Sequence, residues 1–333
     1  MATYKEIRGT QIEAVATDPS NPVEGQIWYN TTSNVLKGQA ATAAGSWATG
    51  GSLNNGIVGN AGFGTYTAAV SVGGMKSPGI TSVVEEYNGS AWSNVTAIPA
   101  GTDSVGSCGT ETAGLIFGGQ RPPNTNNSFE YNGSSWTAGG NLNTTRRDLI
   151  GAGTQTAALA GFGAIDPPYS AVAEQYNGTN WTSVASGNTA RRSAAGGGTS
   201  TSALAYGGYT GSPAYSAATE SWNGSSWTEV ADLSTVKGIL GGGGTSNTDQ
   251  LAFGGYGGPP ESQRFANTEA WNGSSWTEVA DLSVARSTKN SLPSASTANQ
   301  LYAGGHTPPA LYTTITEEWT GAGAAQTRTF DDS

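Results

Sequence analysis

Tyr131-Asn132-Gly133-Ser134-Ser135-Trp136 is one of five closely similar six-residue stretches in this chain. The other copies run from Tyr87 to Trp92, Tyr176 to Trp181, Trp222 to Trp227 and Trp271 to Trp276, and a degraded sixth copy begins at Trp319. Their first aromatic residues follow one another every 44 to 49 residues. A period in the forties with one aromatic hairpin per unit is typical of a repeat architecture.

The Asn-Gly pair inside each copy predicts a β-hairpin. Asn-Gly favours a two-residue type I′ turn, because both central positions of that turn need a positive φ. Such a turn places Tyr131 opposite Ser134 and makes Tyr131 and Trp136 a diagonal pair on one face. We expect these rings to be structural, covered by a neighbouring sheet. The residues in this role are Tyr87, Trp92, Tyr131, Trp136, Tyr176, Trp181, Trp222, Trp227, Trp271, Trp276, Trp319 and Trp47.

Composition favours an all-β protein. Glycine contributes 50 of 333 residues and clusters at fixed places in each repeat, which indicates many short strands and tight turns. Only 36% of the residues are hydrophobic, so we expect the core to come from many small layers built on ten Trp and thirteen Tyr. A chain of this length can be two average domains or one all-β domain.

Charge and residue counts argue against several classes of partner and cofactor. The formal net charge is −10 and no basic stripe exists, which disfavours nucleic acid as a partner. One cysteine, Cys108, and one histidine, His306, give no basis for a metal site, and we expect no cofactor. The N-terminus lacks the apolar core of a secretion signal, and no apolar run of 18 residues exists, so we expect no membrane insertion.

Each repeat divides into four strand-like pieces, a to d. In one unit, Leu149–Gly153 gives strand a, Ala157–Gly161 gives b, Ala171–Tyr176 gives c, and d continues from the closing tryptophan. Strand b ends in a glycine pair in five units, and in Phe162-Gly163 in the third. Six b and six c strands predict six blades. The outer strand of the last blade comes either from the stretch around Trp47, as a clasp, or from Ala325–Phe330.

The glycine pair, the Glu-x-aromatic pattern and the closing Trp together resemble the kelch repeat over roughly residues 45–320. The resemblance implies a six-bladed kelch-like β-propeller. We assign residues 39–333 to the propeller and the more charged, glycine-poor residues 1–38 to a short N-terminal β-hairpin module.

The N-terminal module contains a second resemblance. Residues 18–30, Asp-Pro-Ser-Asn-Pro-Val-Glu-Gly-Gln-Ile-Trp-Tyr-Asn, are similar to a stretch near the start of tailed-phage virion proteins, including kelch-like fibre proteins of marine phages. This resemblance implies a virion appendage or tail fibre, assembled in the host cytoplasm. Its N-terminal module would attach to other virion proteins through Ile27, Trp28 and Tyr29, and a homo-oligomer on the virion is compatible with that role.

The loops of a four-stranded blade predict where a ligand would bind. The b–c and d–a loops share one end of a propeller, and here the b–c loops vary around a proline and are rich in tyrosine, while the c–d and a–b loops are uniform. Variable loops on a rigid scaffold favour recognition, and we expect a host-surface glycan or protein as the ligand. The candidate ligand-binding residues are Arg121, Asp166, Tyr169, Tyr209, Tyr215, Tyr256, His306, Tyr312, Arg147 and Arg192.

A basic residue ten positions after the closing Trp recurs at Arg146, Arg191, Lys237 and Arg286, and a glutamate two before the first aromatic recurs at Glu85, Glu174, Glu220, Glu269 and Glu317. Two interpretations are open. The glutamates form buried bridges to these cations or to the backbone, because a buried charge needs a partner. Alternatively, the cations form a ring at the channel mouth that binds acidic sugars.

Enzymatic activity is not expected. One His and one Cys cannot build a copper oxidase site, and the repeated Asp-box pattern of sialidases is absent. A polysaccharide depolymerase needs two facing carboxylates, and the sequence pairs none of the four candidates, which are Asp103, Asp148, Asp166 and Glu261. The alternatives to host recognition are a purely structural decoration protein of capsid or tail and, second, a surface polysaccharide depolymerase.

Overall fold

A computed structural model describes residues 12–19, 26–39, 45–165, 168–211, 214–257, 263–289, 292–309, 311–321 and 327–330. All regular structure in these ranges is β, and none of their segments is a helix able to cross a membrane. The chain forms two compact units. The first combines Met1–Gly45 with Gly321–Ser333, and the second is Ser46–Thr320.

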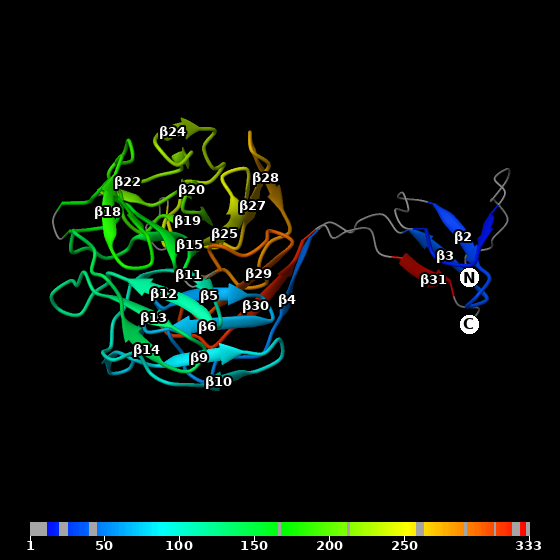
Figure 1. Ribbon diagram of the computed structural model, residues 1–333, viewed down its shortest axis with the longest axis horizontal. Helices are drawn as coiled ribbons and strands as arrows, with labels where there is room; N and C mark the ends of the chain where they lie inside the picture. Colours follow the sequence, from blue (N-terminus) through cyan, green and yellow to red (C-terminus); the bar gives the residue numbers. More distant parts are fainter. Residues whose placement is uncertain are drawn as a thin grey trace. The chain divides into compact units, whose positions relative to one another are not determined.

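The second unit contains five four-stranded antiparallel sheets, arranged with a sixth around one centre (Figure 1). Sheet one is β5 (Ala61–Thr65), β6 (Ala68–Val72), β9 (Val84–Tyr87) and β10 (Trp92–Asn94). Sheet two is β11 (Gly106–Thr110), β12 (Ala113–Phe117), β13 (Ser128–Tyr131) and β14 (Trp136–Ala138). Sheet three is β15 (Ile150–Thr154), β16 (Ala157–Gly161), β17 (Ala173–Tyr176) and β18 (Trp181–Val184). Strand b of the third unit therefore has the predicted bounds.

Two more complete sheets follow along the chain. Sheet four is β19 (Ala195–Thr199), β20 (Ser202–Tyr206), β23 (Thr219–Trp222) and β24 (Trp227–Val230). Sheet five is β25 (Gly241–Ser246), β26 (Asp249–Phe253), β27 (Thr268–Trp271) and β28 (Trp276–Val279). Two short hairpins lie in b–c loops: β7 (Met75–Lys76) with β8 (Gly79–Ile80), and β21 (Tyr209–Gly211) with β22 (Ala214–Tyr215).

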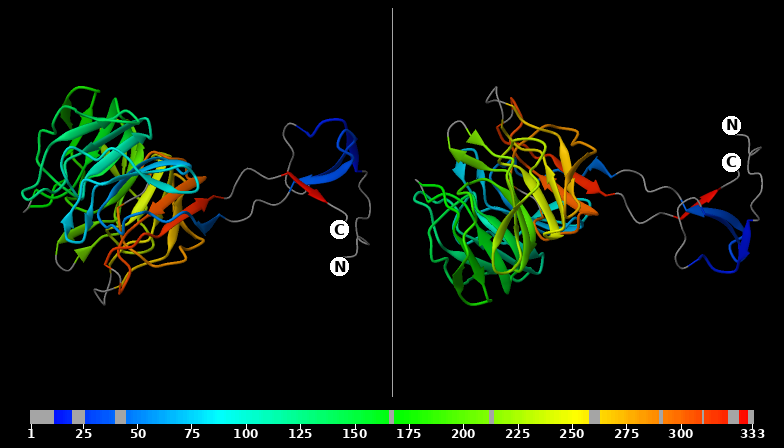
Figure 2. Two further views of the ribbon diagram at one scale, coloured as in Figure 1. Left: turned by 90° about the horizontal axis from the view of Figure 1, so that it is seen from below. Right: turned by 90° about the horizontal axis from the view of Figure 1, so that it is seen from above.

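The sixth sheet joins the two ends of this unit. Its strands are β29 (Asn299–Ala303), β30 (Thr316–Thr320) and β4 (Ser46–Thr49), and Trp319 lies opposite Trp47. The stretch around Trp47 therefore supplies the outer strand, which decides between the two sequence alternatives. The C-terminal strand β31 (Thr327–Phe330) pairs instead with β3 (Val35–Gln39) of the first unit (Figures 1 and 2). Residues 321–333, which the sequence analysis assigned to the propeller, therefore belong to the first unit.

The turn inside the repeated hexad differs from the prediction. Tyr131 pairs directly with Trp136, so the loop has four residues and not two. Asn132 Oδ1 accepts hydrogen bonds from the backbone N–H of Ser134 and Ser135, at 3.0 and 2.9 Å, and Gly133 has a φ of 88°. The type I′ assignment was wrong, because the asparagine side chain captures the turn and only the glycine takes a positive φ. The two rings still share one face, with centroids 4.6 Å apart.

The hexad rings pack between neighbouring sheets. Nine of the twelve predicted structural aromatics are buried, and Trp47, Trp136 and Trp276 are half-buried. Trp181 of sheet three donates its indole N–H to Ser128 Oγ of sheet two at 3.0 Å. Trp92 of sheet one likewise donates to Thr316 of sheet six at 3.0 Å. These two closing tryptophans thus cover the sheet before their own and tie the two sheets together.

The innermost strands approach so closely that several positions exclude a side chain. A Cβ on Gly151 of β15 would lie 2.2 Å from the carbonyl oxygen of Ser107 on β11. Real Cβ atoms do not come this near to a backbone oxygen, so a larger residue here would force the two sheets apart. The high glycine content of the chain follows partly from this crowding.

The first unit is a four-stranded sheet in the order β1 (Glu13–Val15), β2 (Ile27–Asn30), β3, β31. Trp28 is fully buried, and its indole N–H donates to Asp18 at 3.0 Å. Asn30 and Lys37 also donate to Asp18, and hydrogen bonds from Lys37, Trp28 and Asn30 lower the pKa of this carboxyl to about 2. Trp28 is therefore a core residue of this unit.

Candidate functional site

The b–c loops and the d–a connections meet at one end of the second unit, as the topology predicts. Residues before an inner strand pair with residues after the glycine position of the same sheet: Arg147 with Ala164, Arg192 with Tyr209, and Ser287 with His306. We call this end the loop face. It carries all the predicted ligand-binding residues that the structure describes.

Four tyrosines of the loop face form a continuous chain of ring contacts. The ring centroids of Tyr169 and Tyr209 are 5.6 Å apart, those of Tyr209 and Tyr215 are 5.1 Å apart, and those of Tyr215 and Tyr256 are 5.6 Å apart. All four side chains are half-buried. The contacts run across the loops of sheets three, four and five, and we call this row the tyrosine ridge.

Arginines flank the tyrosine ridge at both ends. The Arg192 guanidinium lies 5.6 Å from the Tyr169 ring centroid and 5.2 Å from that of Tyr209. Arg264 lies 5.0 Å from the Tyr256 ring centroid and contacts His306 of sheet six. Burial, followed by the charge of Arg264, lowers the pKa of His306 and favours its neutral form. Stacked guanidinium groups hold the rings in place and leave flat, amphipathic edges at the surface.

Exposed apolar side chains of this unit also gather at the loop face. Among the described residues, the large hydrophobic side chains that are exposed are Ile165, Val236 and Leu311, at 38%, 46% and 60%. Ile165 and Leu311 lie in b–c loops and Val236 in a d–a connection. The Val236 backbone is packed close to the tyrosine ridge, because a Cβ on Gly257 would lie 2.8 Å from Val236 O and 3.2 Å from Tyr215 Cγ. Single exposed hydrophobics are common on protein surfaces, and in the described part of this unit all three of the large ones lie at the loop face.

The recurring cations do not form a ring at the channel mouth. Arg146, Arg191, Lys237 and Arg286 are fully buried and pair with Glu174, Glu220, Glu269 and Glu317. Burial lowers the pKa of Arg146 to about 10 although Glu174 opposes the shift. Each pair ties a d–a connection to strand c of the sheet that it enters. In sheet one, Glu85 accepts hydrogen bonds from Asn54 and Asn55 instead.

The remaining predicted residues lie apart from the tyrosine ridge or outside the described ranges. Arg121 lies over Phe129 at 5.4 Å, and Tyr312 is half-buried in the b–c loop of sheet six with no ring contact to the ridge. Asp166 is outside the described residues. Arg264 was not among the sequence candidates, because it lies late in its b–c loop and outside the repeated pattern.

Charged side chains on adjacent sheets curve around the mouth of the central axis. Asp103 belongs to sheet two, Arg147 and Asp148 to sheet three, and Arg192 to sheet four. Arg147 donates to Gln120 Oε1 at 2.8 Å, and Arg192 donates to Asp148 Oδ2 at 3.2 Å. We call these four residues the charged crescent. Arg192 contacts both Asp148 of the crescent and the rings of Tyr169 and Tyr209, so this residue connects the two features.

A belt of backbone hydrogen bonds fixes the position of the crescent. One residue per sheet, each with a positive φ, donates its N–H to the carbonyl of its counterpart in the preceding sheet. The distances are 2.9, 2.8, 3.1 and 2.8 Å along the series Gly59, Ser104, Asp148, Ser193 and Ile239. The belt links sheets one to five and sets the residues beside it around the axis.

Asp103 is the carboxylate of the crescent for which no ion pair is found among the described residues, whereas Asp148 pairs with Arg192. The residue is 5% exposed, and its Oδ1 atom is enclosed without a hydrogen-bond partner in the described part of the chain. Burial raises its pKa to about 6, helped by the charge of Asp148 and opposed by Arg147 and Lys289. A buried acceptor without a partner is costly, and such groups are enriched at functional sites. The sequence pointed to Asp103 only as a possible carboxylate near this face.

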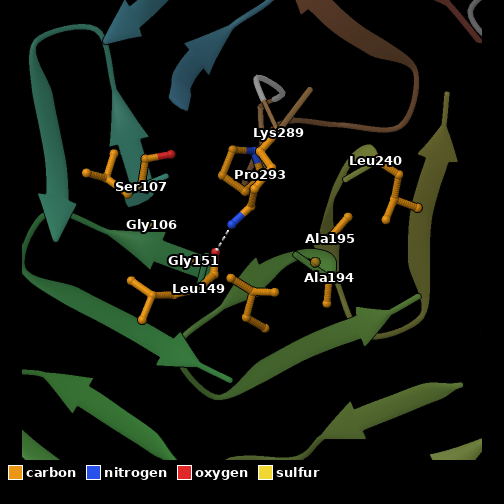
Figure 3. A pocket seen from close by; sticks show the side chains of 12 residues that line it. Gly106, Ser107, Leu149, Gly151, Ala194, Ala195, Leu240, Lys289 and Pro293 are labelled. Carbon is orange, nitrogen blue, oxygen red and sulfur yellow. Dashed lines mark hydrogen bonds between the residues drawn. The ribbon is translucent and has the colours of Figure 1, made fainter. Parts of the chain in front are cut away.

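The axis itself is closed by a segment of the sixth repeat. Lys289 enters the centre and donates to the carbonyl of Leu149 at 2.8 Å (Figure 3). Burial lowers the pKa of Lys289 to about 8, although Asp148 and Asp103 oppose the shift. Farther along, Pro293 O accepts from Gly198 N at 3.0 Å, and a Cβ on Gly197 would lie 1.9 Å from it. The cavity of about 30 Å³ beside Lys289 holds no more than about one water.

The described residues contain no cluster of three or more His, Cys, Asp or Glu side chains that could hold a metal ion. Of the four candidate carboxylates, Asp103 and Asp148 lie near enough to each other for the charge of Asp148 to raise the pKa of Asp103. Of the other two, Glu261, like Asp166, lies outside the described residues.

Comparisons with known proteins identify the fold alone. No protein-family model and no curated protein matches this sequence significantly. Among solved structures, one titled "Structure of YjhT" matches with a TM-score of 0.69 and 14% sequence identity, over 85% of this chain and 100% of that chain. The all-β fold of antiparallel sheets is thus β-propeller-like.

Proposed function

We propose that this chain is a structural protein of a tailed-phage virion, a fibre or appendage that displays a six-bladed kelch-like propeller for recognition of a host-surface glycan. The resemblance of residues 18–30 to virion proteins supports the virion placement. The repeat pattern, the six sheets and the clasp strand β4 support a closed six-bladed propeller.

The observation that carries recognition is the tyrosine ridge. Four half-buried rings in unbroken edge-to-face and tilted contact hold one another in place, so a ligand gains aromatic contact area at little entropic cost. Aromatic faces accept the C–H surfaces of sugar rings, while the tyrosine hydroxyls and the flanking arginines supply hydrogen bonds. A glycan lying along the ridge would cross the loops of sheets three to five.

Attachment to the virion is assigned to the first unit. Its sheet has one face that carries Ile12, Ile27, Tyr29 and Leu36, since alternate residues of paired strands share a face. Ile12 and Tyr29 are 42% and 36% exposed. Trp28 points to the opposite face and is buried, so it supports the fold of this unit and Ile27 and Tyr29 remain the attachment candidates.

Replacement of Tyr209 and Tyr215 by alanine tests recognition. We expect the double variant to lose at least tenfold in affinity on an array of bacterial surface polysaccharides, because buried aromatic anchors dominate interface energies. Tyr66→Ala is the matched control, since Tyr66 is half-buried in an a–b loop at the other end of the unit. Equal binding by the double variant and the wild-type chain would refute recognition through the ridge.

Attachment is tested separately with a chain that lacks residues 1–45 and 321–333. This deletion removes the first unit and leaves all six sheets of the second. We expect a protein that still binds its glycan but no longer joins the particle. Incorporation of the deleted chain into particles at the wild-type level would refute the assignment.

A surface polysaccharide depolymerase is the second candidate function. The observation that favours it is the coupling of Asp103 and Asp148 at the axial mouth, since glycoside hydrolysis uses two carboxylates held in different environments. Release of new reducing ends from a bound polysaccharide, abolished in Asp148→Asn, would establish this activity. Binding without any release would leave recognition as the function.

A further inference from the structure

Asp103 is the group on the loop face whose chemistry calls most clearly for a ligand. Its Oδ1 atom is enclosed with no hydrogen-bond partner in the described part of the chain. Arg147 donates a hydrogen bond to Gln120, and Arg192 donates one to Asp148, so the other charged groups of the crescent have protein partners. Such a carboxylate has room for one more donor, which a water or a ligand on the loop face can supply.

The surroundings of Asp103 restrict the class of donor. Arg147 and Lys289 face Asp103 together with Asp148, and Arg192 lies next in the crescent. Three cationic groups against two carboxylates repel a cationic ligand, while Asp103 itself repels an anionic one. A neutral hydroxyl can donate to the carboxylate and accept from a guanidinium at the same time. The charges therefore favour a neutral polyol.

The crescent is also placed to act together with the tyrosine ridge. Arg192 contacts Asp148 on one side and the rings of Tyr169 and Tyr209 on the other. The backbone belt holds Asp148 in a rigid frame, so the crescent needs little reorganisation to receive a ligand. A sugar stacked at the Tyr169 end of the ridge would direct its hydroxyl groups toward the axial mouth.

We propose that Asp103 is the hydroxyl-binding subsite of the loop face, where its carboxylate accepts a hydrogen bond from a neutral sugar residue that also contacts Arg192. This inference rests on the proposed function and names the chemistry of that same face. It also predicts that sugar affinity depends on pH, because a protonated Asp103 is a weaker hydrogen-bond acceptor than the carboxylate. The charged groups that face Asp103 are Arg147 and Asp148, which precede β15, and Lys289 of the sixth repeat.

The test uses the full chain and saturation-transfer NMR with five probes: glucose, galactose, mannose, glucosamine and glucuronate. We expect binding of at least one neutral hexose in preference to both charged sugars. Asp103→Asn and Asp103→Ala should each weaken that binding at least fivefold at pH 7.5. Asp249→Asn is the control, because Asp249 accepts a hydrogen bond from Thr297 near the a–b loop end and should leave binding unchanged.

Two further readouts separate a binding role from a structural one. The affinity of the wild-type chain should fall as the pH is lowered from 7.5 to 5, and that of Asp103→Asn should stay constant. Thermal melting should show both Asp103 variants folded at pH 7.5. Wild-type affinity for the hexose in both variants, or preference for a charged sugar, would overturn the inference. If the ridge variants still lose polysaccharide binding in that case, the proposed function stands.

Discussion

Ala173→Ser should stabilise the second unit by supplying an acceptor that one tryptophan lacks. Closing tryptophans of four sheets donate their indole N–H to a hydroxyl on the first residue of strand c in the preceding sheet. The donor–acceptor distances are 2.9 Å for Trp47 with Thr268, 3.0 Å for Trp92 with Thr316, 3.0 Å for Trp181 with Ser128 and 3.2 Å for Trp276 with Thr219. In sheet three the corresponding residue is Ala173, and the buried indole N–H of Trp227 has no hydrogen-bond partner among the residues that the structure describes.

The expected magnitude follows from the cost of that unsatisfied donor. An intramolecular hydrogen bond contributes about 0.5–1.5 kcal/mol net, and a buried unsatisfied group costs about 1–3 kcal/mol. Burial of the new serine hydroxyl offsets part of this gain, so we expect Ala173→Ser to raise the free energy of unfolding by about 1 kcal/mol. The reverse change at the corresponding position, Ser128→Ala, should lower it by about 1–2 kcal/mol, because Trp181 then loses its acceptor.

Chemical denaturation of the full chain measures both changes, and a double-mutant cycle with Trp227→Phe isolates the new contact. If the serine bonds to the indole, Ala173→Ser should stabilise the wild type and give no stabilisation in the Trp227→Phe background. A serine variant that is less stable than wild type, with no coupling to Trp227, would refute the reasoning.

Three further changes test other interactions. Asp103→Asn should stabilise the fold by roughly 1–3 kcal/mol at pH 8 and very little at pH 4. In the folded chain the pKa of Asp103 is raised from 3.8 to about 6, so the wild-type protein loses stability as the pH rises through that window and the asparagine variant does not. Denaturation of both proteins at the two pH values measures the difference. Glu174→Ala should lower the unfolding free energy by about 3–5 kcal/mol, because it leaves Arg146 buried and unpaired, whereas Glu229→Ala on an exposed strand position should change it little. Tyr131→Phe removes the 2.6 Å hydrogen bond to Glu86 of the preceding sheet and should cost about 1–2 kcal/mol by the same measurement.

Periodic features of the sequence were sufficient to predict the sheets and the face that the loops share. The bounds of strand b in the third unit, the common face of Tyr131 and Trp136, and the position of the variable loops follow from local spacing. Strand a was predicted one residue too early, and strand c begins at Ala173 and not at Ala171. The prediction of the turn failed because propensity for Asn-Gly does not say whether the asparagine uses its backbone or its side chain. In every described copy the side chain accepts bonds from the two residues before the Trp, and this widens the loop.

Features that depend on contacts between distant repeats could not be predicted. The sixth repeat uses Lys289 and Pro293 to cross the axis, and nothing in its own spacing shows which glycines of other sheets will receive it. The charge state of Asp103 is of the same kind, because it depends on residues from two other repeats. The tyrosine ridge was predicted residue by residue, but its continuity requires three loops to converge. The composition of each loop indicates a tendency to bind, but only the fold shows that the tyrosines of the three loops contact one another.

The head residue of the repeated hexad is Tyr in the first three sheets and Trp in the last three, and its contacts indicate that the repeats are matched to their neighbours. The hydroxyl of Tyr131 bonds to Glu86 of sheet one, and that of Tyr176 bonds to Glu130 of sheet two. Where the preceding sheet has Gln175, Ser221 or Ala270 in place of the glutamate, the head residue is tryptophan and donates to the loop of its own sheet. By this rule Tyr87 of sheet one needs a glutamate in the sheet before it. It bonds to Glu318 of sheet six, so the residue that joins the first and last sheets obeys the same pairing as every internal interface.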